Sequence, residues 1–306
     1  MLAPPSGIGH DTLADVLQTG WSIAPSALSY APLGFGSHHW IADDHFVTVD
    51  EATDELVLRA ALTTARSLRD DAGLEFVIAP IPAHDGRLIV PLARSWVVHV
   101  YERLEITDET GFGPHDDPEV VALVQAIHEA TPIVGHHARR EDFFIWARDD
   151  LANALSNLDG PWDTGPYGEP ARRLLAENAD DVRHLLAAHD GLVNDVPGDG
   201  WVVTHGEPHR GNIFRTTSGW AVVDWDTVLI APAERDFWDI GGAPCDPQLA
   251  QLYRMRWDLA DIAVYVAGFC ADHTGDANDD RSWENLVSYL DVRNRWPDQC
   301  GRPAPS

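Results

Sequence analysis

The sequence predicts an α+β protein of two lobes, a small β-rich lobe followed by a larger helical one. Residues 27–104 contain short apolar runs separated by glycine and aspartate turns, which is typical of antiparallel strands. From residue 118 onward, long segments repeat their apolar residues at helical spacing. We therefore predict an N-terminal lobe over 1–104, a linker between the lobes near 101–105, and a C-terminal lobe over 105–306.

The first lobe is predicted to consist mainly of strands. An amphipathic helix over 11–21 precedes residues 27–50, which we expect to form a strand, a glycine turn and two further strands. A helix is predicted over 54–71, where the apolar residues return to helical spacing behind an aspartate cap. Strands are predicted over 75–81 and 94–104.

The second lobe is predicted to be helical, apart from one segment rich in polar groups. Its helices are expected over 118–131, 140–155, 170–193, 248–270 and 281–294. Residues 202–227 instead contain two short apolar strands around a polar loop.

The chain is strongly acidic, with a formal net charge of −28, and all of its 21 Lys and Arg residues are arginine. A surface of this charge repels nucleic acid and anionic membranes, and it attracts cationic small molecules. The acidity also suits a high-salt cytoplasm or a genome that avoids lysine codons. We predict a small-molecule substrate, cationic in character, and no nucleic-acid or membrane partner.

The sequence also bears on where the protein is located. It has no run of about 18 uninterrupted apolar residues, and its first residues lack the basic start and apolar stretch of a signal peptide. Cys245, Cys270 and Cys300 are widely spaced and odd in number, which argues against a disulfide framework. We expect a cytoplasmic protein.

Residues 202–227 hold two histidines, a glutamate, an asparagine and two aspartates. A zinc protease would need glutamate directly after the first histidine on a helix, whereas Glu207 lies two residues after His205 and a proline follows it. A zinc deaminase would need a second cysteine three residues after Cys245, where Gln248 stands. A polar loop with purely structural histidines remains an alternative.

Phosphoryl transfer accounts for the same groups in another way. Kinase-type loops carry a carboxylate that accepts the proton of the substrate hydroxyl, and an asparagine five residues later that binds metal. A metal-binding aspartate follows the next hairpin. Glu207, Asn212 and Asp224 have this order and spacing.

The motif HGEPHRGN (205–212) followed by VVDWD (222–226) resembles the aminoglycoside phosphotransferase family, whose pattern is H-G-D-x-H-x-x-N followed by I-D-W. Residues 222–242 and 253–265 are similar in particular to the spectinomycin phosphotransferases. The resemblance implies a protein-kinase-like fold, ATP and Mg²⁺ as cofactors, and transfer of a phosphoryl group to an alcohol.

The resemblance also implies roles for individual residues. Glu207 takes the position of the catalytic base, and Asn212 and Asp224 take the two metal-ligand positions. Those that match the phosphate-covering turn and the adenine-binding linker are Gly34, Gly36, Ser37, Tyr101 and Leu104. Those that match the supports of the catalytic loop are His205, His209 and Asp236. Candidates to face the ammonium groups of the substrate are Asp226 and Glu234.

Two positions depart from the family pattern. Asp50 stands where the third strand should end in a lysine that binds the nucleotide phosphates, and the chain has no lysine to replace it. Glu207 stands in place of aspartate, and its side chain is longer by one C–C bond, roughly 1.5 Å. Candidates for the replacement cation are His38, His39, Arg59, Arg66 and Arg69.

We therefore predict an ATP-dependent O-phosphotransferase that acts on a hydroxyl of a cationic antibiotic, such as an aminoglycoside or aminocyclitol. The same motif suits a kinase of a cellular small alcohol or sugar, because a fold does not fix its substrate. The missing lysine also suits a catalytically weak pseudokinase that binds a ligand.

Overall fold

The computed structural model describes residues 1–5, 7–34, 36–93, 95–107 and 118–297. The chain divides into two compact units. The first consists of Met1–Glu141 and Asp199–Cys245, and the second of Asp142–Gly198 and Asp246–Ser306. The boundary predicted near residue 104 falls inside the first unit, which therefore holds both the N-terminal strands and the catalytic-loop motif.

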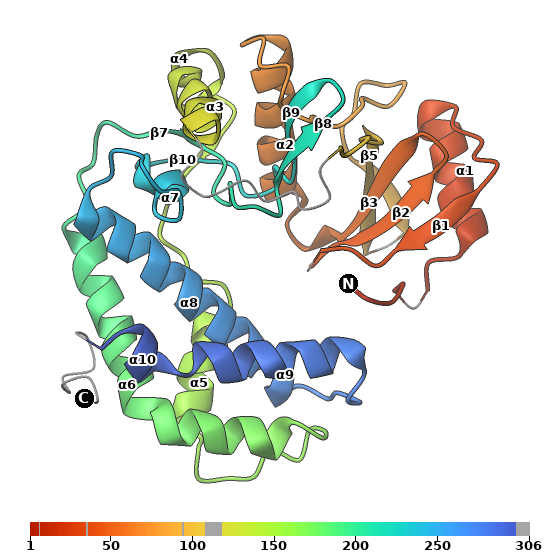
Figure 1. Cartoon of the computed structure of the whole chain (residues 1–306). Coiled ribbons are helices and arrows are strands. Elements are labelled where there is room, and N and C mark those ends of the chain that lie inside the picture. The colour runs from red at the N-terminus through yellow and green to blue at the C-terminus, as the bar shows by residue number, and fades with distance from the viewer. Residues whose placement is uncertain (6, 35, 94, 108–117, 298–306) are drawn as a thin grey trace. The chain divides into compact units, whose positions relative to one another are not determined.

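A five-stranded antiparallel sheet organises the N-terminal part of the first unit (Figure 1). Its strands are β1 (Leu28–Ala31), β2 (His38–Ala42), β3 (His45–Glu51), β4 (Val90–Ala93) and β5 (Trp96–Glu102). Their order in the sheet is β1-β2-β3-β5-β4. This confirms the strand, glycine turn and two strands predicted over 27–50, and the strand predicted over 94–104.

The apolar face of this sheet is covered by a helix. Side chains alternate along each strand, so Trp40, Val47, Val49 and Val98 point to one face and are buried there. Helix α1 (His10–Trp21) packs its own apolar side against them. This burial fixes the sheet against α1, and the opposite face of the sheet does not contribute to this core.

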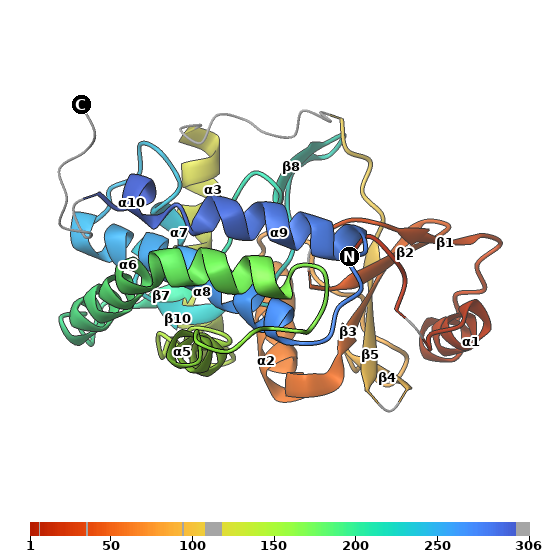
Figure 2. The same ribbon diagram turned by 90° about the horizontal axis from the view of Figure 1, so that it is seen from below.

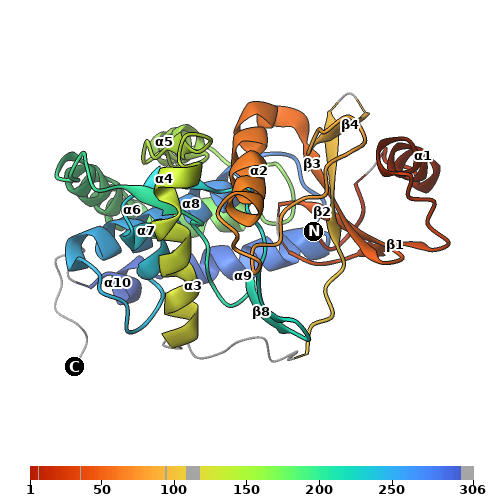
Figure 3. The same cartoon turned by 90° about the horizontal axis from the view of Figure 1, so that it is seen from above.

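The opposite face carries polar side chains. Thr48 and Asp50 alternate with the buried valines of β3, and His99 and Tyr101 alternate with those of β5. A short 3-10 helix leads from β3 into helix α2 (Glu55–Asp70), which covers part of this face and confirms the helix predicted over 54–71. Figure 3 shows α1 and α2 on opposite sides of the sheet.

The remaining elements of the first unit surround the catalytic-loop motif. They are α3 (Pro118–Glu129), α4 (Thr131–Val134), β6 (Arg139–Arg140), β7 (Val202–Thr204), β8 (Ile213–Thr216), β9 (Gly219–Val222), β10 (Leu229–Ala231) and α7 (Glu234–Phe237). Strands β6, β10 and β7 form a three-stranded sheet, and β8 and β9 form a hairpin. Buried residues of α2, α3 and these strands share one core, which holds the loop ends in place.

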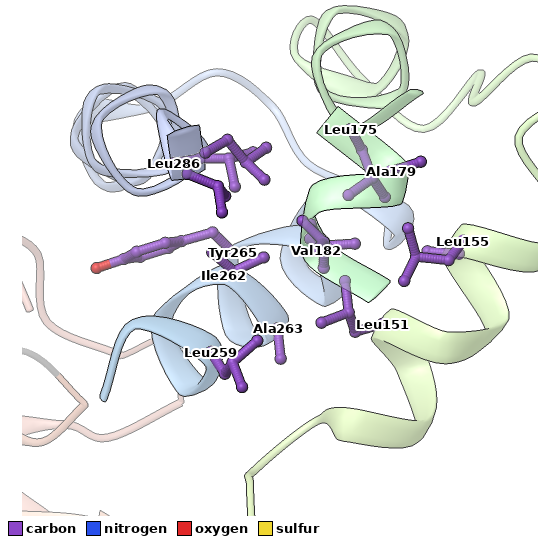
Figure 4. Packing of buried hydrophobic residues seen from close by; sticks show 14 of the residues in the cluster. Leu151, Leu155, Leu175, Ala179, Val182, Leu259, Ile262, Ala263, Tyr265 and Leu286 are labelled. Carbon is purple, nitrogen blue, oxygen red and sulfur yellow. The ribbon is translucent and has the colours of Figure 1, made fainter. Parts of the chain in front are cut away.

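The second unit is helical (Figure 2). Its helices are α5 (Arg148–Ser156), α6 (Gly168–Asn194), α8 (Pro247–Cys270), α9 (Ala277–Tyr289) and α10 (Val292–Arg295). Helix α8 packs against α5, α6 and α9. Figure 4 shows this core, where Leu151 and Leu155 of α5, Val182 of α6 and Ile262 of α8 point toward one another. The α+β prediction, with a β-sheet region and a helical region, is confirmed.

Several predicted elements were wrong, in the first unit and at the start of the second. Residues 75–81 are not a strand, and only Val77 forms an isolated bridge, to Val222. Pro80 and Pro82 lack the N–H that a strand would donate. Strand β4 was not predicted. The helix predicted over 140–155 begins only at Arg148, because residues just before it adopt left-handed backbone, which ends a helix.

The C-terminal helix predicted over 281–294 is two helices. Helix α9 begins earlier, at Ala277, because Asp276 and Asp279 form a capping box there. It ends at Tyr289, and α10 begins at Val292.

Two further predictions concern membranes and cysteines. None of the helices within the described residues combines the length and apolar character that crossing a membrane requires. Cys245 and Cys270 form no disulfide within the described residues, and Cys300 lies outside them.

The helical core predicts the effect of one substitution. Leu259 of α8 is fully buried, so Leu259→Ala should lower the free energy of unfolding by about 3 kcal/mol through lost contacts and a cavity. Leu56 of α2 is 78% exposed, and Leu56→Ala should change it by less than about 0.5 kcal/mol. Urea denaturation followed by circular dichroism measures both. Equal effects would contradict this packing.

Candidate active site

The loop between β7 and β8 begins with a turn that only glycine accommodates. Gly206 has a φ of +103°, a conformation that side chains disfavour. A Cβ atom at this position would overlap the guanidinium group of Arg235. The turn therefore presents the next residue, Glu207, half-buried at the surface of the loop.

A buried carboxylate holds the start of this loop. Oδ2 of Asp236 accepts a hydrogen bond from the His205 N–H at 3.0 Å, and Oδ1 accepts one from the Gly206 N–H at 2.6 Å. Nε2 of His128 on α3 lies 2.8 Å from Oδ2. Burial alone would raise the pKa of Asp236, but the hydrogen bond and charge of His128, together with Arg235, lower it. Asp236 thus stays ionised and binds the loop to α3 and α7.

Arg235 supports the other side of the loop. Its guanidinium donates to Oγ1 of Thr204 at 2.9 Å and to the Thr227 carbonyl at 2.7 Å. Nε of Arg235 lies 3.4 Å from Oε2 of Glu141, and both side chains are buried. Thr227 in turn donates its hydroxyl to the His205 carbonyl. These contacts connect β7, the loop and the segment after Asp226.

His205 joins the loop to the strand that carries Asp224. Its Nε2 donates to the Val223 carbonyl at 2.8 Å, and its Nδ1 accepts the Glu207 N–H at 3.2 Å. Burial lowers the pKa of His205 to about 4, so the ring is neutral at pH 7. The histidine is therefore a fixed spacer between two segments of the site.

His209 and Asn212 set the second half of the loop. Nδ1 of His209 accepts the Gly211 N–H at 3.0 Å, which directs Nε2 toward Oε2 of Glu207 at 3.8 Å. Nδ2 of Asn212 donates to the Glu207 carbonyl at 3.0 Å. The amide oxygen of Asn212 is consequently the atom left to bind a cation.

Two aspartates follow strand β9 and flank a buried tryptophan. Asp224 has a φ of 67°, in the left-handed region that aspartate tolerates better than most residues. The indole of Trp225 is fully buried and donates to the Val222 carbonyl at 2.9 Å. With this indole as an anchor, the side chains of Asp224 and Asp226 remain exposed to solvent.

Burial and the charges of neighbouring acids both act on the carboxylates of this region. The surrounding protein, followed by the charges of Glu207 and Asp50, raises the pKa of Asp224 to about 6. Removal from water also raises the pKa of Asp226, to about 7, and the charges of Asp224 and Asp50 contribute to this rise. Since both side chains are exposed, a cation from solution can reach them. We name Asp50, Glu207, Asp224 and Asp226 the carboxylate cluster.

The carboxylate of Asp50 accepts hydrogen bonds from neighbouring side chains. Nε2 of His99 lies 2.6 Å from Oδ2 of Asp50, and the Ser37 hydroxyl bonds the same carboxylate. Nδ1 of His99 lies 2.9 Å from the Tyr101 hydroxyl. The side chain of Tyr101 experiences the charges of Asp224, Asp50 and Asp226, so it faces the carboxylate cluster.

The residues predicted to bind nucleotide lie in two places, the turn between β1 and β2 and the end of β5. Gly34 and Gly36 both have positive φ in the turn between β1 and β2, and Ser37 contacts Asp50. Leu104 follows the end of β5, and within the described residues its backbone N–H and C=O have no hydrogen-bond partner. Tyr101 lies within β5 rather than in the linker, and its side chain is the part that reaches the site.

The arginines considered as replacement cations are occupied elsewhere. Arg59 pairs with Glu55, and Arg66 pairs with Asp70 at 2.5 Å. Arg69 donates to the carbonyls of Glu75 and Val77. A pocket of about 500 Å³ beside α2 includes Arg59 and Arg66 in its lining but none of the carboxylate cluster.

The histidines of the glycine turn are not equivalent. His38 is buried on the apolar side among Tyr30, Trp40 and Trp96, and burial lowers its pKa. His39 lies on the polar face, where its Nδ1 is 3.2 Å from Oγ1 of Thr48. Burial lowers the pKa of His39 to about 4, so it is neutral at pH 7.

Sequence reasoning missed several residues of this arrangement. Glu234, which was predicted, is the first residue of α7, and it is not among the charges that raise the pKa of Asp224. His99, His128 and Arg235 were not singled out. The alternation Val-Thr-Val-Asp over 47–50 could have indicated that Asp50 lies on the face opposite the core.

Comparison with known proteins gives a consistent picture. The sequence pattern of the phosphotransferase enzyme family matches residues 44–278. Protein StrN of Streptomyces griseus is 32% identical over 242 residues, which are 73% of this chain and 74% of StrN.

Solved structures share the fold. Spectinomycin phosphotransferase APH(9)-Ia, in complex with ADP and spectinomycin, has a TM-score of 0.74 at 17% identity and covers 96% of this chain and 100% of its own. Amicoumacin kinase hAmiN, in complex with AMP-PNP, Ca²⁺ and Ami, has a TM-score of 0.57 at 12% identity over 94% of each chain. The resemblance inferred from the motif is thereby confirmed, together with the kinase-like fold.

The glycine turn predicts a matched pair of substitutions. Gly206→Ala places a methyl group against Arg235 in a disfavoured conformation, so it should lower the free energy of unfolding by about 2 kcal/mol or more. Gly191→Ala on α6 meets no atom within 4 Å and should leave stability equal or raise it by about 0.5 kcal/mol. Thermal denaturation distinguishes them. A tolerated Gly206→Ala would contradict this geometry.

The carboxylate cluster predicts a pH dependence of stability. Because the pKa of Asp226 is about 7 in the folded protein and 3.8 ordinarily, the native state binds the extra proton, and stability falls as pH rises from about 4 to 7. Asp226→Asn should therefore stabilise the metal-free protein at pH 8 by about 1 kcal/mol, a value reduced for solvent exposure, and not at pH 4.

Urea denaturation at the two pH values measures this difference. Asp199→Asn, at an exposed position, is the control for loss of one negative charge. A stabilisation by Asp226→Asn that is equal at both pH values would show that the charge of Asp226 is not the cause.

Proposed function

We propose that this chain, which belongs to the phosphotransferase enzyme family, transfers the γ-phosphoryl group of ATP to a hydroxyl of a small cationic molecule. Membership of the family makes it a phosphotransferase with an alcohol group as acceptor. The observation that carries the finer proposal is the carboxylate cluster, in which Glu207 and Asp224 act on each other's charge from two segments fixed by Asp236 and His205.

Glu207 serves as the general base in this proposal. Its carboxylate accepts the proton of the acceptor hydroxyl while that oxygen forms a bond to the γ-phosphorus. The bond from the γ-phosphorus to the β–γ bridging oxygen breaks, and ADP leaves with that electron pair. His209 directs Nε2 toward Glu207, and the Asn212 amide holds the Glu207 carbonyl, so both residues orient the base.

Asp224 and Asn212 have the chemistry to hold Mg²⁺. The Asp224 carboxylate is exposed and is acted on by the charges of Glu207 and Asp50, and the Asn212 amide is oriented by the bond from its nitrogen to the Glu207 carbonyl. Mg²⁺ prefers oxygen ligands and commonly binds through one or two protein groups plus substrate phosphates. No three His, Cys, Asp or Glu side chains in the described part of the chain are grouped as ligands, which fits a site completed by nucleotide. Bound there, the ion would neutralise charge on the phosphates.

The nucleotide is proposed to lie against the polar face of the five-stranded sheet. Gly34, Gly36 and Ser37 supply the turn over the phosphates, and the backbone of Leu104, which bonds no described residue, is available to adenine. The structures of APH(9)-Ia with ADP and of hAmiN with AMP-PNP support nucleotide binding by this fold. If Leu104 binds adenine, the linker between the two lobes lies near residues 101–105, as predicted from the sequence.

The acceptor is proposed to be an aminocyclitol, an aminoglycoside or a similar amine-bearing antibiotic. The net charge of −28 attracts cations, and Asp226 presents an exposed carboxylate beside Asp224. Glu234 is a further candidate on α7. The spectinomycin bound to APH(9)-Ia supports this class of acceptor.

The decisive experiment measures ADP release with purified protein, Mg²⁺, ATP and a panel of aminocyclitols, aminoglycosides, small amino alcohols and sugars. Asp224→Ala should reduce kcat by about 10²–10³-fold because it removes the main charge at the phosphates, and Glu207→Gln should reduce it by at least about 10²-fold. Asp199→Asn should retain wild-type turnover.

Each alternative has its own outcome in this experiment. Wild-type turnover in Asp224→Ala would overturn the proposed mechanism. Turnover confined to amino alcohols or sugars would replace the antibiotic by a cellular acceptor. Thermal stabilisation by an antibiotic, with none by millimolar ATP and Mg²⁺, would make the protein a ligand-binding pseudokinase.

A further inference from the structure

The polar face of the five-stranded sheet poses a charge problem for a site that binds ATP, and the inference drawn from it rests on the proposed function. The carboxylates of Asp50, Glu207, Asp224 and Asp226 already act on one another there. The phosphates of ATP add further negative charge, which kinases balance with metal ions and a lysine. This chain has no lysine.

The cations suggested by the sequence do not meet this need. Arg59 and Arg66 are paired with acids of α2, and Arg69 is held by backbone carbonyls. His38 lies on the apolar side, and His39 is neutral at pH 7. This leaves the other polar side chains of this face as candidates to contact the phosphates.

His99 has the contacts that hold a positive charge. It is buried on β5, diagonally opposite Asp50 on β3. Its Nε2 lies 2.6 Å from Oδ2 of Asp50, which is within hydrogen-bond distance, and such bonds to a carboxylate are strongest when the imidazole is charged. Its Nδ1 lies 2.9 Å from the Tyr101 oxygen, so both ring nitrogens face oxygen atoms. Although burial alone would raise the pKa of Asp50, the hydrogen bond and charge of His99 lower it, so the carboxylate is ionised.

Tyr101 connects this pair to the carboxylate cluster. Its phenol shares the face of Asp50 and experiences the charges of Asp224 and Asp226 as well. Desolvation and those charges raise the pKa of Tyr101 well above its ordinary value. The phenol therefore keeps its proton and is available as a hydrogen-bond donor.

We propose that Asp50 and His99 form the ion pair that takes the place of the phosphate-binding lysine, and that Tyr101 donates its phenol proton to the nucleotide phosphates. His99 is an imidazolium that donates from Nε2 to Asp50 and from Nδ1 to the Tyr101 oxygen. Because the phenol oxygen then accepts from His99, its own proton points outward. Tyr101 contacts the nucleotide, while Asp50 and His99 position and polarise it.

The arrangement preserves the charge balance of a kinase with the partners exchanged. In protein kinases a lysine on the third strand pairs with a helix glutamate. Here the acid stands on β3, and the cation stands on the neighbouring strand β5. The pair is neutral as a whole in both cases, and it offers a polarised donor to phosphate.

Binding of ATP and of adenosine tests the role of Tyr101, because only ATP has phosphates. Tyr101→Phe keeps the ring and removes the donor, so the Kd for Mg²⁺-ATP should rise about 10–100-fold while the Kd for adenosine stays unchanged. Tyr265→Phe in the helical unit is the matched control and should bind both like wild type. Calorimetry with circular dichroism as a check of folding gives both constants.

A double-mutant cycle and NMR test the ion pair. Asp50→Asn should weaken Mg²⁺-ATP binding about as much as Tyr101→Phe, and the double variant should lose little more, because both changes disable one unit. The ¹⁵N shifts of His99 in the ATP complex should report two protonated nitrogens, and His99→Gln should identify those signals. Wild-type ATP affinity in Tyr101→Phe, additive losses in the double variant, or a neutral His99 would each overturn the inference.

The same measurements separate this inference from the proposed function. If wild-type protein binds no ATP, the proposed function fails and the inference fails with it. If wild-type protein binds ATP and the variants bind it equally well, the proposed function stands and only the inference is overturned.

Discussion

The hydrogen bonds to the buried carboxylate of Asp236 are the interaction on which the geometry of the candidate site most depends. Two consecutive backbone N–H groups and one imidazole converge on this side chain, so it joins the catalytic loop to α3 and α7. An enclosed charge tolerates no lost partner, because an uncompensated buried ion is strongly destabilising. The loop start is therefore fixed, and His205 transmits that position to the strand end that carries Asp224.

This rigid support holds together carboxylates whose proximity is energetically unfavourable in the absence of a cation. Burial, followed by the charges of neighbouring carboxylates, raises the pKa values of Asp224 and Asp226. A flexible loop would relax by moving them apart. Because Asp236, Arg235 and His205 fix these segments, the carboxylates stay in place, and this is the basis of the proposed affinity for a cation. Under the proposed function, metal and nucleotide together would complete the site.

Sequence reasoning was strongest where the signal is local. Glu207, Asn212 and Asp224 lie within one short segment, and the spacing of that segment alone indicated phosphoryl transfer. The alternation of β3 and the helical periodicity of α2 and α6 are local in the same sense. The residues that were missed act over long sequence separations. Asp50 meets His99 only because β3 pairs with β5, and His128 meets Asp236 only because α3 packs beside α7. Strand β4 and the late start of α5 were missed for a similar reason, since sheet pairing and left-handed backbone overrode local propensity.

The pleat of β3 has a consequence for how this protein can change. Val47 and Val49 belong to the core under α1, whereas Thr48 and Asp50 belong to the opposite face. Inserting or deleting one residue in this strand would turn every later side chain over, so the valines would meet solvent and the aspartate would enter the core. The core and the proposed phosphate site are therefore inherited as one unit. Descendants of this sequence can exchange the chemistry at position 50 by substitution, but they cannot move it along the strand.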